Sequence, residues 1–390
     1  MNITIIVKGR FHLFDLTREL EKFGHKIVLI TTLPIFVAKK FGIFTSTIKS
    51  QIFVELVERF WMKFPASFTK KINIQYFIMD FFGKQASKKI TPKGDILLAG
   101  SSSALHAIRY AKKIGYRVTI LERGSSHIEY QYKILLQEQE RYGIKKAVTH
   151  PRIIAKELLE YQEADFISVP SNFVKNTFLE YGIPSKKILL NPYGVNLSQF
   201  QPKLPTVEMM NDSDGMFRII HCGGINLRKG VQYLLSAFSR VNLPNSELLL
   251  IGSMSDEFKP IYNALKTKNV YHLGPFPQKD LVRQYQKGSI FCLASIEEGL
   301  AMVIPQAMAC GLPVICTVNT GGGDIVRDGI DGFVIPIRDL DALCSSIKKL
   351  YFDPSLQYQM GINARERVSQ GFGWDDYARR AEIIFSDLLR

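Results

Sequence analysis

The chain has 390 residues, of which 46% are hydrophobic and 22% charged, so disorder, collagen and a coiled-coil rod are excluded, and about 150 residues per domain predicts two domains. The formal net charge of +14 lies entirely in one half, because residues 1–210 hold 31 basic and 17 acidic side chains whereas residues 211–390 hold 19 of each. We therefore expect the two halves to contact different partners.

In the first half, short apolar runs alternate with stretches of helical periodicity such as 14–23 and 102–114. Alternating strands and helices, with Gly or Pro at the turns, favour a parallel sheet covered by helices on both faces. The predicted strands of this half are 3–7, 27–31, 96–99, 118–121, 166–169 and 188–191.

Residues 39–71 place lysines around an apolar stripe with helical spacing. Such a helix either packs on the first sheet or lies on an anionic membrane surface, where each contacting Lys contributes about 1 kcal/mol. The sequence leaves both interpretations open. The stripe is Ile52, Phe53, Leu56, Val57, Phe60, Trp61 and Phe64, and the lysines are Lys39, Lys40, Lys49, Lys63, Lys70 and Lys71.

A segment rich in proline and polar residues, 201–215, lacks periodicity, and we predict the linker between the domains there. The second half resumes the alternation, so each half has enough units for its own doubly wound sheet in an α/β fold. The predicted strands are 218–221, 247–251, 270–273, 290–293, 314–316 and 332–334, and the predicted helices are 231–240, 279–286, 302–309 and 340–351.

Two glycines, Gly223 and Gly224, follow a predicted strand, and Arg228 and Lys229 precede the next predicted helix. Glycines let the backbone approach a ligand closely, and a helix N-terminus adds partial positive charge. With two full charges at the same end, this stretch suits a diphosphate, at about 1.5–3 kcal/mol per charge-assisted contact. The alternative is a tight turn whose cations are solvated.

An acidic pair, Glu297 and Glu298, follows another predicted strand, and Gly299 turns the chain into a helix. Ligands of open α/β sheets lie beyond the carboxyl ends of the strands, so Glu298 is placed to accept hydrogen bonds from sugar hydroxyls. Gln306 lies about two turns along the helix on nearly the same face. The alternative for Glu298 is an acidic cap of that helix.

Together these segments resemble the donor-binding half of the retaining glycosyltransferases of the GT-B fold, the family 4 type. The resemblance covers about residues 188–374. In the family's order, the sequence contains Asn191-Pro192-Tyr193-Gly194-Val195-Asn196, Arg228-Lys229-Gly230, Leu250-Ile251-Gly252, Leu273-Gly274-Pro275, Ser295-Ile296-Glu297-Glu298-Gly299, Gln306-Ala307-Met308-Ala309-Cys310-Gly311-Leu312-Pro313-Val314, Thr320-Gly321-Gly322, Asp331-Gly332-Phe333 and Phe372-Gly373-Trp374.

The resemblance implies two Rossmann-like domains that face each other across a cleft. These are an acceptor-side domain at 1–195, a donor domain at 196–372 and a last helix at 373–390 that crosses back to the first domain. The implied catalytic residues are Glu298, which holds the transferred sugar, Arg228 and Lys229, which neutralise the diphosphate, and His127. The implied donor-binding residues are Gly223, Gly224, Arg228, Lys229, Gly274, Pro275, Glu298, Gly299, Leu300, Ala301, Met302, Val303 and Gln306.

Main-chain groups around Gly274 and Pro275 would frame the base, and the amides of Met302 and Val303 would lie near the phosphates. The sequence departs from the family at Gln306, where the family has a Glu that grips the ribose. Leu300 and Ala301 also replace the family's aromatic residue and glycine. Since a Gln accepts a hydrogen bond but lacks the charge, we expect weaker ribose fixation rather than an inactive protein.

The first half resembles the family more loosely, and its candidate residues follow two predicted strands. After the first strand, where the family has a glycine loop, the alternative is a solvated turn with a packed His. After the strand 118–121, similar enzymes place a His over the sugar. The cleft candidates are Gly9, Arg10, His12, Glu122, Arg123 and His127.

All five cysteines lie in the neutral half, their number is odd and no C-x-x-C pair occurs, so we expect a reducing compartment and no disulfide scaffold or zinc site. The N-terminus is charged too soon for a signal peptide, and no run of about 18 apolar residues predicts a membrane span. We expect a cytoplasmic protein, peripheral on the inner face of the membrane if 39–71 contacts lipid.

The resemblance implies a metal-independent, hexosyl-type glycosyltransferase that moves a sugar, with retention of the anomeric configuration, from a nucleotide-diphosphate sugar to a glycan or lipid-linked acceptor in surface polysaccharide or glycolipid synthesis. We expect no cofactor beyond this co-substrate, because cations and helix N-termini stabilise the leaving diphosphate. The alternatives are a GT-B enzyme of other sugar-nucleotide chemistry, such as an epimerase, and a basic nucleic-acid-binding protein. The charge of the first half favours an anionic acceptor or membrane surface over nucleic acid.

Overall fold

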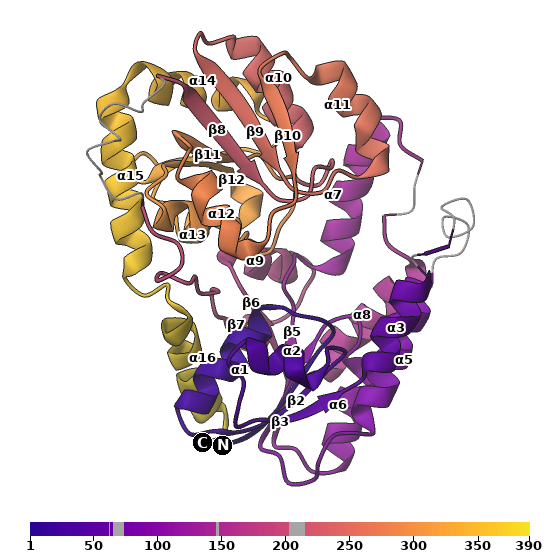
Figure 1. Cartoon of the computed structure of the whole chain (residues 1–390). Coiled ribbons are helices and arrows are strands. Elements are labelled where there is room, and N and C mark those ends of the chain that lie inside the picture. The colour runs from indigo at the N-terminus through magenta and orange to yellow at the C-terminus, as the bar shows by residue number, and fades with distance from the viewer. Residues whose placement is uncertain (62, 65–73, 146–147, 203–214) are drawn as a thin grey trace.

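The computed structural model describes residues 1–61, 63–64, 74–145, 148–202 and 215–390, and its strands form one sheet in each of two lobes (Figure 1). Within these residues the first sheet is parallel, in the order β3-β2-β1-β4-β5-β6-β7. Its strands are β1 (Asn2–Val7), β2 (Lys26–Thr31), β3 (Thr47–Ser50), β4 (Ile96–Gly100), β5 (Val118–Glu122), β6 (Phe166–Val169) and β7 (Ile188–Leu190). Most are nearly continuous apolar runs, as expected for a parallel sheet with both faces covered.

The sheet of the second lobe is also parallel among the described residues, in the order β10-β9-β8-β11-β12-β13. In both sheets the strand order reverses beside the first strand, β1 or β8, which creates a crevice at the carboxyl ends of the strands. The strands are β8 (Phe217–Cys222), β9 (Ser246–Ile251), β10 (Val270–Gly274), β11 (Ile290–Leu293), β12 (Val314–Thr317) and β13 (Gly332–Ile335).

Helices connect the strands and cover the sheets. Those before the second sheet are α1 (His12–Lys22), α2 (Ile35–Lys40), α3 (Ile52–Trp61), α5 (Gln75–Ser87), α6 (Leu105–Lys113), α7 (Ile128–Arg141), α8 (Pro151–Glu163) and α9 (Asn172–Glu180). The later ones are α10 (Val231–Val241), α11 (Lys259–Leu265), α12 (Gln278–Tyr285), α13 (Val303–Ala309), α14 (Leu340–Phe352), α15 (Pro354–Ser369) and α16 (Trp374–Leu388).

The predicted α/β fold with two doubly wound sheets is confirmed, and each predicted strand lies within one residue of an observed strand at both ends. The prediction missed β3, whose sequence Thr-Ile-Lys-Ser has a single apolar residue. This strand pairs with β2 at the edge of the sheet and its side chains are partly or fully exposed, so burial imposes no apolar pattern on it. The predicted linker at 201–215 falls largely on residues 203–214, outside the described residues.

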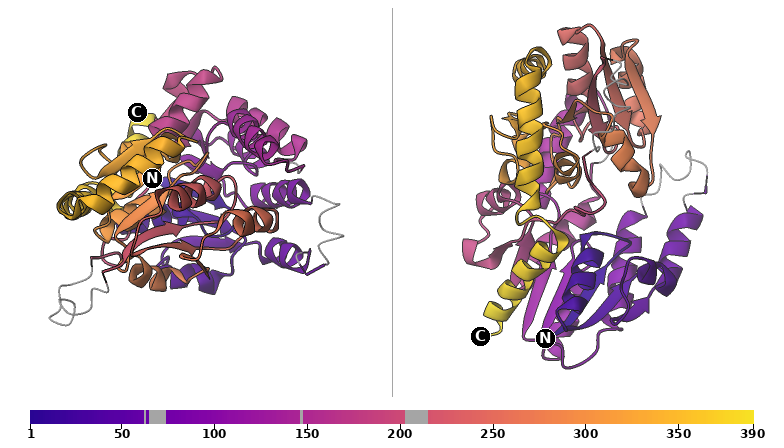
Figure 2. Two further views of the ribbon diagram at one scale, coloured as in Figure 1. Left: turned by 90° about the horizontal axis from the view of Figure 1, so that it is seen from above. Right: turned by 60° about the vertical axis from the view of Figure 1, so that its left-hand side comes forward.

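The last helix, α16, leaves the second lobe and lies beside α1 of the first (Figure 2). Two connections run together at this crossing, where the amide of Val195 donates to the carbonyl of Phe372 at 2.8 Å. Further along, Nη2 of Arg380 donates to the carbonyl of Pro192 at 2.7 Å. Residues from 374 onward therefore pack on the first lobe although they follow the second in the chain.

Helix α7 extends from the first lobe to the second (Figure 1). Its N-cap, His127, packs in the first lobe, whereas Glu138 near its other end is fully buried against the second. The carboxylate of Glu138 accepts hydrogen bonds from Gln232 at 2.9 Å and Tyr233 at 2.8 Å, and it pairs with Arg338 at 2.7 Å. Helix α7 therefore packs on both lobes, although it lies wholly before the domain boundary predicted near residue 195.

Helix α3 exposes most of its part of the predicted apolar stripe to solvent instead of packing it on the first sheet. Among the residues of α3, Val54 is buried, whereas Phe53 and Phe60 are 63% and 64% exposed. Lys70 and Lys71 of the same predicted segment lie outside the described residues. In the described part of the chain, no helix is both long and apolar enough to cross a membrane.

Candidate functional site

The turn between β8 and α10 carries the two cations predicted at a diphosphate. Gly223 has a φ of +146°, a backbone conformation that favours glycine, and a Cβ there would only touch Lys229, at 3.5 Å from its Cε. Gly230 has a φ of +64°, and a Cβ there would lie 1.7 Å from the carbonyl oxygen of Ala294. The turn into α10 therefore requires a glycine next to Lys229.

Arg228 and Lys229 meet the acidic pair that follows β11. Nζ of Lys229 lies 2.6 Å from Oε1 of Glu298, and Nη2 of Arg228 lies 3.8 Å from Oε2 of Glu298. Burial by itself would lower the pKa of Arg228, but Glu298 and Glu297 outweigh it and raise that pKa. The structure thus brings together the predicted diphosphate cations and the predicted sugar-binding carboxylate.

Backbone hydrogen bonds hold the loop that carries Glu298. Its amide donates to the carbonyl of Asn319 at 2.9 Å, and the amide of Ala301 donates to the carbonyl of Thr320 at 3.1 Å. Ala301 and its neighbour Leu300 are 4% and 5% exposed and belong to the hydrophobic core. Leu300 and Ala301 therefore anchor the loop by packing in the core, and their side chains do not line an open surface.

Gly299, which follows Glu298 in the chain, lies against the first lobe. A Cβ at Gly299 would lie 1.9 Å from the carbonyl oxygen of Gly124, and the hydroxyl of Ser171 donates to the carbonyl of Gly299 at 2.7 Å. Nearby, the amide of Asn172 donates to the carboxylate of Asp324 at 2.6 Å. The lobes therefore touch through main chain immediately beside Glu298, and this close approach requires a glycine at position 299.

Gln306 lies on α13 with its side chain turned toward α12. It is 7% exposed, and its Oε1 accepts a hydrogen bond from the hydroxyl of Tyr285 at 3.3 Å. The predicted base-binding turn lies after β10, where Gly274 has a φ of +73° and its carbonyl accepts from the amide of Gly252 at 2.9 Å; the next residue, Pro275, is exposed.

A cavity of about 880 Å³ lies between the lobes and brings together Arg10, His12 and Met302 of the predicted site. Its described lining contains five cations and one carboxylate; these are Arg10, Arg18, Lys40, Lys279, Arg283 and Asp15. Asp15 is paired with Arg18 at 2.6 Å, so the rest of this lining is strongly positive. The cluster of Lys229 and Glu298 is not among the residues that line the cavity.

Glu297 is fully buried where the lobes meet, and it is a residue that the sequence reasoning did not assign to the site. Its carboxylate accepts hydrogen bonds from Ser126 and Gln131 of the first lobe and from Nε of Arg228. Burial would raise the pKa of Glu297, but Arg228 and these donors outweigh it and hold that pKa below its usual range. In the sequence, the indication of such a role was that Glu297 directly precedes Glu298 in the acidic pair after β11.

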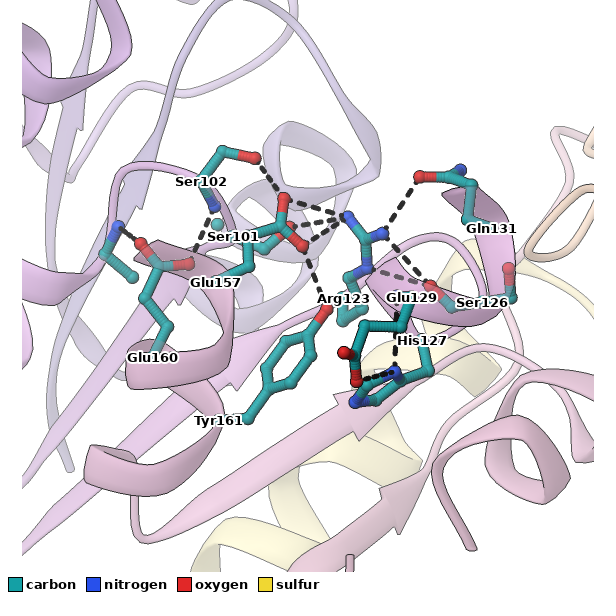
Figure 3. A network of polar contacts seen from close by, with 12 residues as sticks. Ser101, Ser102, Arg123, Ser126, His127, Glu129, Gln131, Glu157, Glu160 and Tyr161 are labelled. Atoms are coloured by element: carbon teal, nitrogen blue, oxygen red, sulfur yellow. Dashed lines mark hydrogen bonds and ion pairs between the residues drawn. The ribbon is translucent and has the colours of Figure 1, made fainter. Parts of the chain in front are cut away.

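Arg123 lies at the centre of a buried polar network behind the cleft (Figure 3). Nη1 of Arg123 pairs with Glu157 at 3.0 Å, and Nη2 donates to the carbonyl of Ser126 at 3.0 Å and to Oε1 of Gln131 at 3.1 Å. The hydroxyl of Tyr161 donates to Glu157 at 2.9 Å. These bonds account for Arg123 as a structural cation that fixes the loop before α7, which differs from its predicted place facing the cleft.

Glu122 and His12 form a second buried pair. Nε2 of His12 lies 3.0 Å from Oε1 of Glu122, and the ring of His12 stacks on Tyr193 at a centroid distance of 3.9 Å. The side chains of His12 and Glu122 are 0% and 4% exposed. Of the first-strand candidates, Arg10 is therefore the exposed cation: its guanidinium lies 3.9 Å from the centre of the Phe41 ring, and Gly9 precedes it with a φ of +69°.

His127, predicted to lie over the sugar, is instead packed inside the first lobe. Its ring stacks on Tyr181 at 4.5 Å, contacts Tyr161 and Phe178, and is 2% exposed. Its Nδ1 accepts a hydrogen bond from the amide of Glu129, so the side chain is the N-cap of α7. The expectation of a sugar-facing His does not match this placement, because the aromatic side chains around the ring exclude a ligand.

Comparisons with known proteins relate the chain to glycosyltransferases. Residues 211–367 match the family described as glycosyl transferases group 1. The capsular polysaccharide biosynthesis glycosyltransferase CapM of Staphylococcus aureus is 28% identical over 211 residues, which are 50% of this chain and 53% of CapM. The chain likewise spans 61% of the length of an archaeal relative that is 22% identical.

Solved structures match nearly the whole chain. Sucrose-phosphate synthase from Thermosynechococcus elongatus has a TM-score of 0.74 at 18% identity, over 99% of this chain and 98% of that one. Alr3699/HepE of Anabaena, solved in complex with UDP-glucose, has a TM-score of 0.71 at 15% identity, over 99% of this chain and 100% of that one. These likenesses confirm the predicted GT-B arrangement of two Rossmann-like lobes.

Proposed function

We propose that this chain, which carries a glycosyl transferases group 1 domain and has the GT-B fold, transfers a sugar from a nucleotide-diphosphate sugar to a glycan or lipid-linked acceptor. The observation that carries the proposal is the cluster of Arg228, Lys229 and Glu298 within the matched residues. Its two cations suit a diphosphate, and its carboxylate suits the hydroxyls of a sugar. The relatives named for polysaccharide synthesis support the same substrate class.

In the proposed reaction, Arg228 and Lys229 stabilise the negative charge that grows on the diphosphate as its bond to the anomeric carbon breaks. The acceptor oxygen forms the new bond on the same face, and its proton passes to the departing phosphate oxygen, so the configuration is retained as in family 4. Arg228 and Lys229 offset the charge of the leaving diphosphate, so we propose a reaction without a metal ion and without a cofactor beyond the donor.

A screen of UDP-, GDP- and ADP-sugars by thermal shift, followed by an assay for released nucleoside diphosphate, tests the proposal. We expect one nucleotide class to raise the melting temperature and to be consumed. A hexosyl donor with uridine is the first to try, because UDP-glucose is bound in the HepE structure. Conversion of the sugar nucleotide without transfer would indicate epimerase-like chemistry, and salt-sensitive RNA retention on a filter without nucleotide-sugar binding would indicate the nucleic-acid alternative.

We propose that the acceptor is anionic, because the cavity between the lobes is lined mainly by cations. Among the described residues, Lys279 and Arg283 form no ion pair with a carboxylate, and the carboxylate near Arg10 is Asp15, which is itself paired with Arg18. The three cations approach the cavity from both lobes. Unpaired cations in a cleft raise the local concentration of an anionic substrate. A phosphate or carboxylate on a lipid-linked or glycan acceptor has the chemistry that this lining favours.

The exposed stripe on α3 supports docking on the cytoplasmic face of an anionic membrane. Phe53, Leu56 and Phe60 are each more than half exposed, and the exposed Lys63 follows α3 in the chain. Apolar side chains that enter the lipid boundary, together with cations at the headgroups, are the features of an interfacial helix. Docking on such a surface would bring the first lobe to a lipid-linked acceptor.

A further inference from the structure

Glu297 contributes one carboxylate to both lobes at once. Its Oε1 accepts hydrogen bonds from the amide and the hydroxyl of Ser126, at 3.0 and 2.7 Å. Its Oε2 accepts from Nε2 of Gln131 at 3.0 Å and from Nε of Arg228 at 2.9 Å. The carboxylate is 0% exposed, and these four bonds fill the sites that two carboxylate oxygens offer.

The bonds to Arg228 hold one end of its guanidinium. Nε donates to the carboxylate and also to the main-chain carbonyl of Glu297 at 3.0 Å. With Nε held in this way, Nη2 extends toward Glu298 at 3.8 Å. The side chain of Arg228 remains 35% exposed, so its free edge is open to a ligand while its inner edge is bound.

On the first lobe, the two partners of Glu297 are themselves fixed by Arg123 (Figure 3). The guanidinium of Arg123 holds the carbonyl of Ser126 and Oε1 of Gln131, and its other side is paired with the buried Glu157. The donors that Glu297 meets are therefore held in place before the lobes meet. Hydrogen bonds and ion pairs therefore link the interior of the first lobe, through Arg123 and Glu297, to Arg228 of the predicted donor site.

We propose that Glu297 is a positioning residue that couples the first lobe to donor binding, because Ser126 and Gln131 hold its carboxylate in the orientation that aims Arg228 at the diphosphate. The inference rests on the proposed function for the identity of the donor. If the lobes separate, Glu297 loses its first-lobe donors and keeps a single partner, Arg228. The bond from Nε of Arg228 to the main-chain carbonyl of Glu297 remains, but an ion pair in water no longer fixes the carboxylate, so the full orientation of Arg228 is reached only when the lobes are docked.

Substitutions confined to the first lobe test this coupling. We expect Gln131→Leu and Ser126→Ala to raise the dissociation constant and the KM of the donor about tenfold, and the acceptor KM to stay unchanged, because each removes a bond to a charged group. Gln137→Leu is the matched control, since Gln137 is exposed on the same helix. Calorimetric titration with the nucleoside diphosphate found in the donor screen measures binding without turnover.

A double-mutant cycle separates positioning from a structural role. In an Arg228→Ala background, Gln131→Leu should have no further effect on the dissociation constant, since the residue through which it acts is gone. Equal effects in both backgrounds, or a lower melting temperature with unchanged donor binding, would overturn the coupling. A wild-type protein that binds no nucleotide would instead refute the proposed function, so the two failures are distinguishable.

Discussion

The ammonium nitrogen of Lys229 lies 2.6 Å from Oε1 of Glu298, so the cation predicted at the donor diphosphate and the carboxylate predicted at the transferred sugar are paired with each other. In the proposed function, a diphosphate that enters the site would exchange this pair for a pair between Lys229 and phosphate. The two residues follow different strands, and their contact brings the proposed phosphate-binding and sugar-binding groups together. Substitution of either residue should therefore separate binding of the nucleotide from turnover.

We expect Lys229→Ala to raise the dissociation constant of the nucleoside diphosphate about tenfold or more, since a charge-assisted contact contributes about 1.5–3 kcal/mol. Glu298→Gln should leave that constant unchanged or lower it, because it frees Lys229, and should reduce kcat about a hundredfold. Calorimetric titration and initial rates measure the two effects. Lys287→Ala, on an exposed lysine of the same lobe, is the control. Equal binding by Lys229→Ala and wild type would place the diphosphate elsewhere.

Gln306→Ala should raise the KM of the donor severalfold, because a neutral hydrogen bond to the ribose contributes about 0.5–1.5 kcal/mol. Gln306→Glu should lower it, because a carboxylate accepts from the ribose hydroxyls more strongly. Steady-state kinetics with the donor varied measure both changes. Since Tyr285 donates to Gln306, Tyr285→Phe controls for loss of that internal bond. An unchanged donor KM in Gln306→Ala would show that Gln306 does not contact the ribose.

Stability should fall in mild acid because of His127. Burial, with a further contribution from Arg123, lowers the pKa of His127 to about 4, whereas the unfolded value is about 6.5. Between these values the unfolded chain binds a proton that the folded chain does not. The contribution is therefore complete above about pH 6.5 and is lost as the pH falls to about 4, by up to about 3 kcal/mol.

His127→Asn tests this prediction, because Asn keeps an N-cap acceptor but does not titrate. Urea unfolding at several pH values should show a shallower loss of the free energy of unfolding in the variant than in the wild type. Some dependence should persist, since burial also lowers the pKa of His221 to about 4. Identical slopes for the variant and the wild type would contradict a neutral, buried His127.

Membrane docking should depend on the stripe of α3. Phe53→Ser with Phe60→Ser removes two exposed rings, each of which contributes about 1.5–3 kcal/mol when it is fully buried in lipid. We expect the double variant to float poorly with vesicles that contain anionic lipid. Phe352→Ser, which changes a 71% exposed ring on the second lobe, is the matched control and should float like the wild type. Equal flotation with and without anionic lipid would remove the membrane proposal.

The contact of Arg228 and Lys229 with Glu298 was predictable because its signals are local in the sequence. Gly223, Lys229 and Glu298 each follow a strand whose apolar run is visible in the sequence, and parallel strands bring their carboxyl ends to one edge. The acceptor side was not predictable in the same way. A polar residue after a strand points either into the cleft or into the interior, and Glu122 and His127 both proved to be buried.

Short segments of the sequence were enough to predict the two parallel sheets, the basic first half and the cations beside Glu298, because apolar periodicity, charge and turn residues are local properties. The tertiary structure decided that Glu297 joins the lobes, that Arg123 and His127 are interior, and that α3 exposes its apolar face. The physical reason is that burial and pairing depend on which distant segments meet. Ser126 and Glu297 are 171 residues apart in the chain, and the docked lobes bring them within hydrogen-bonding distance.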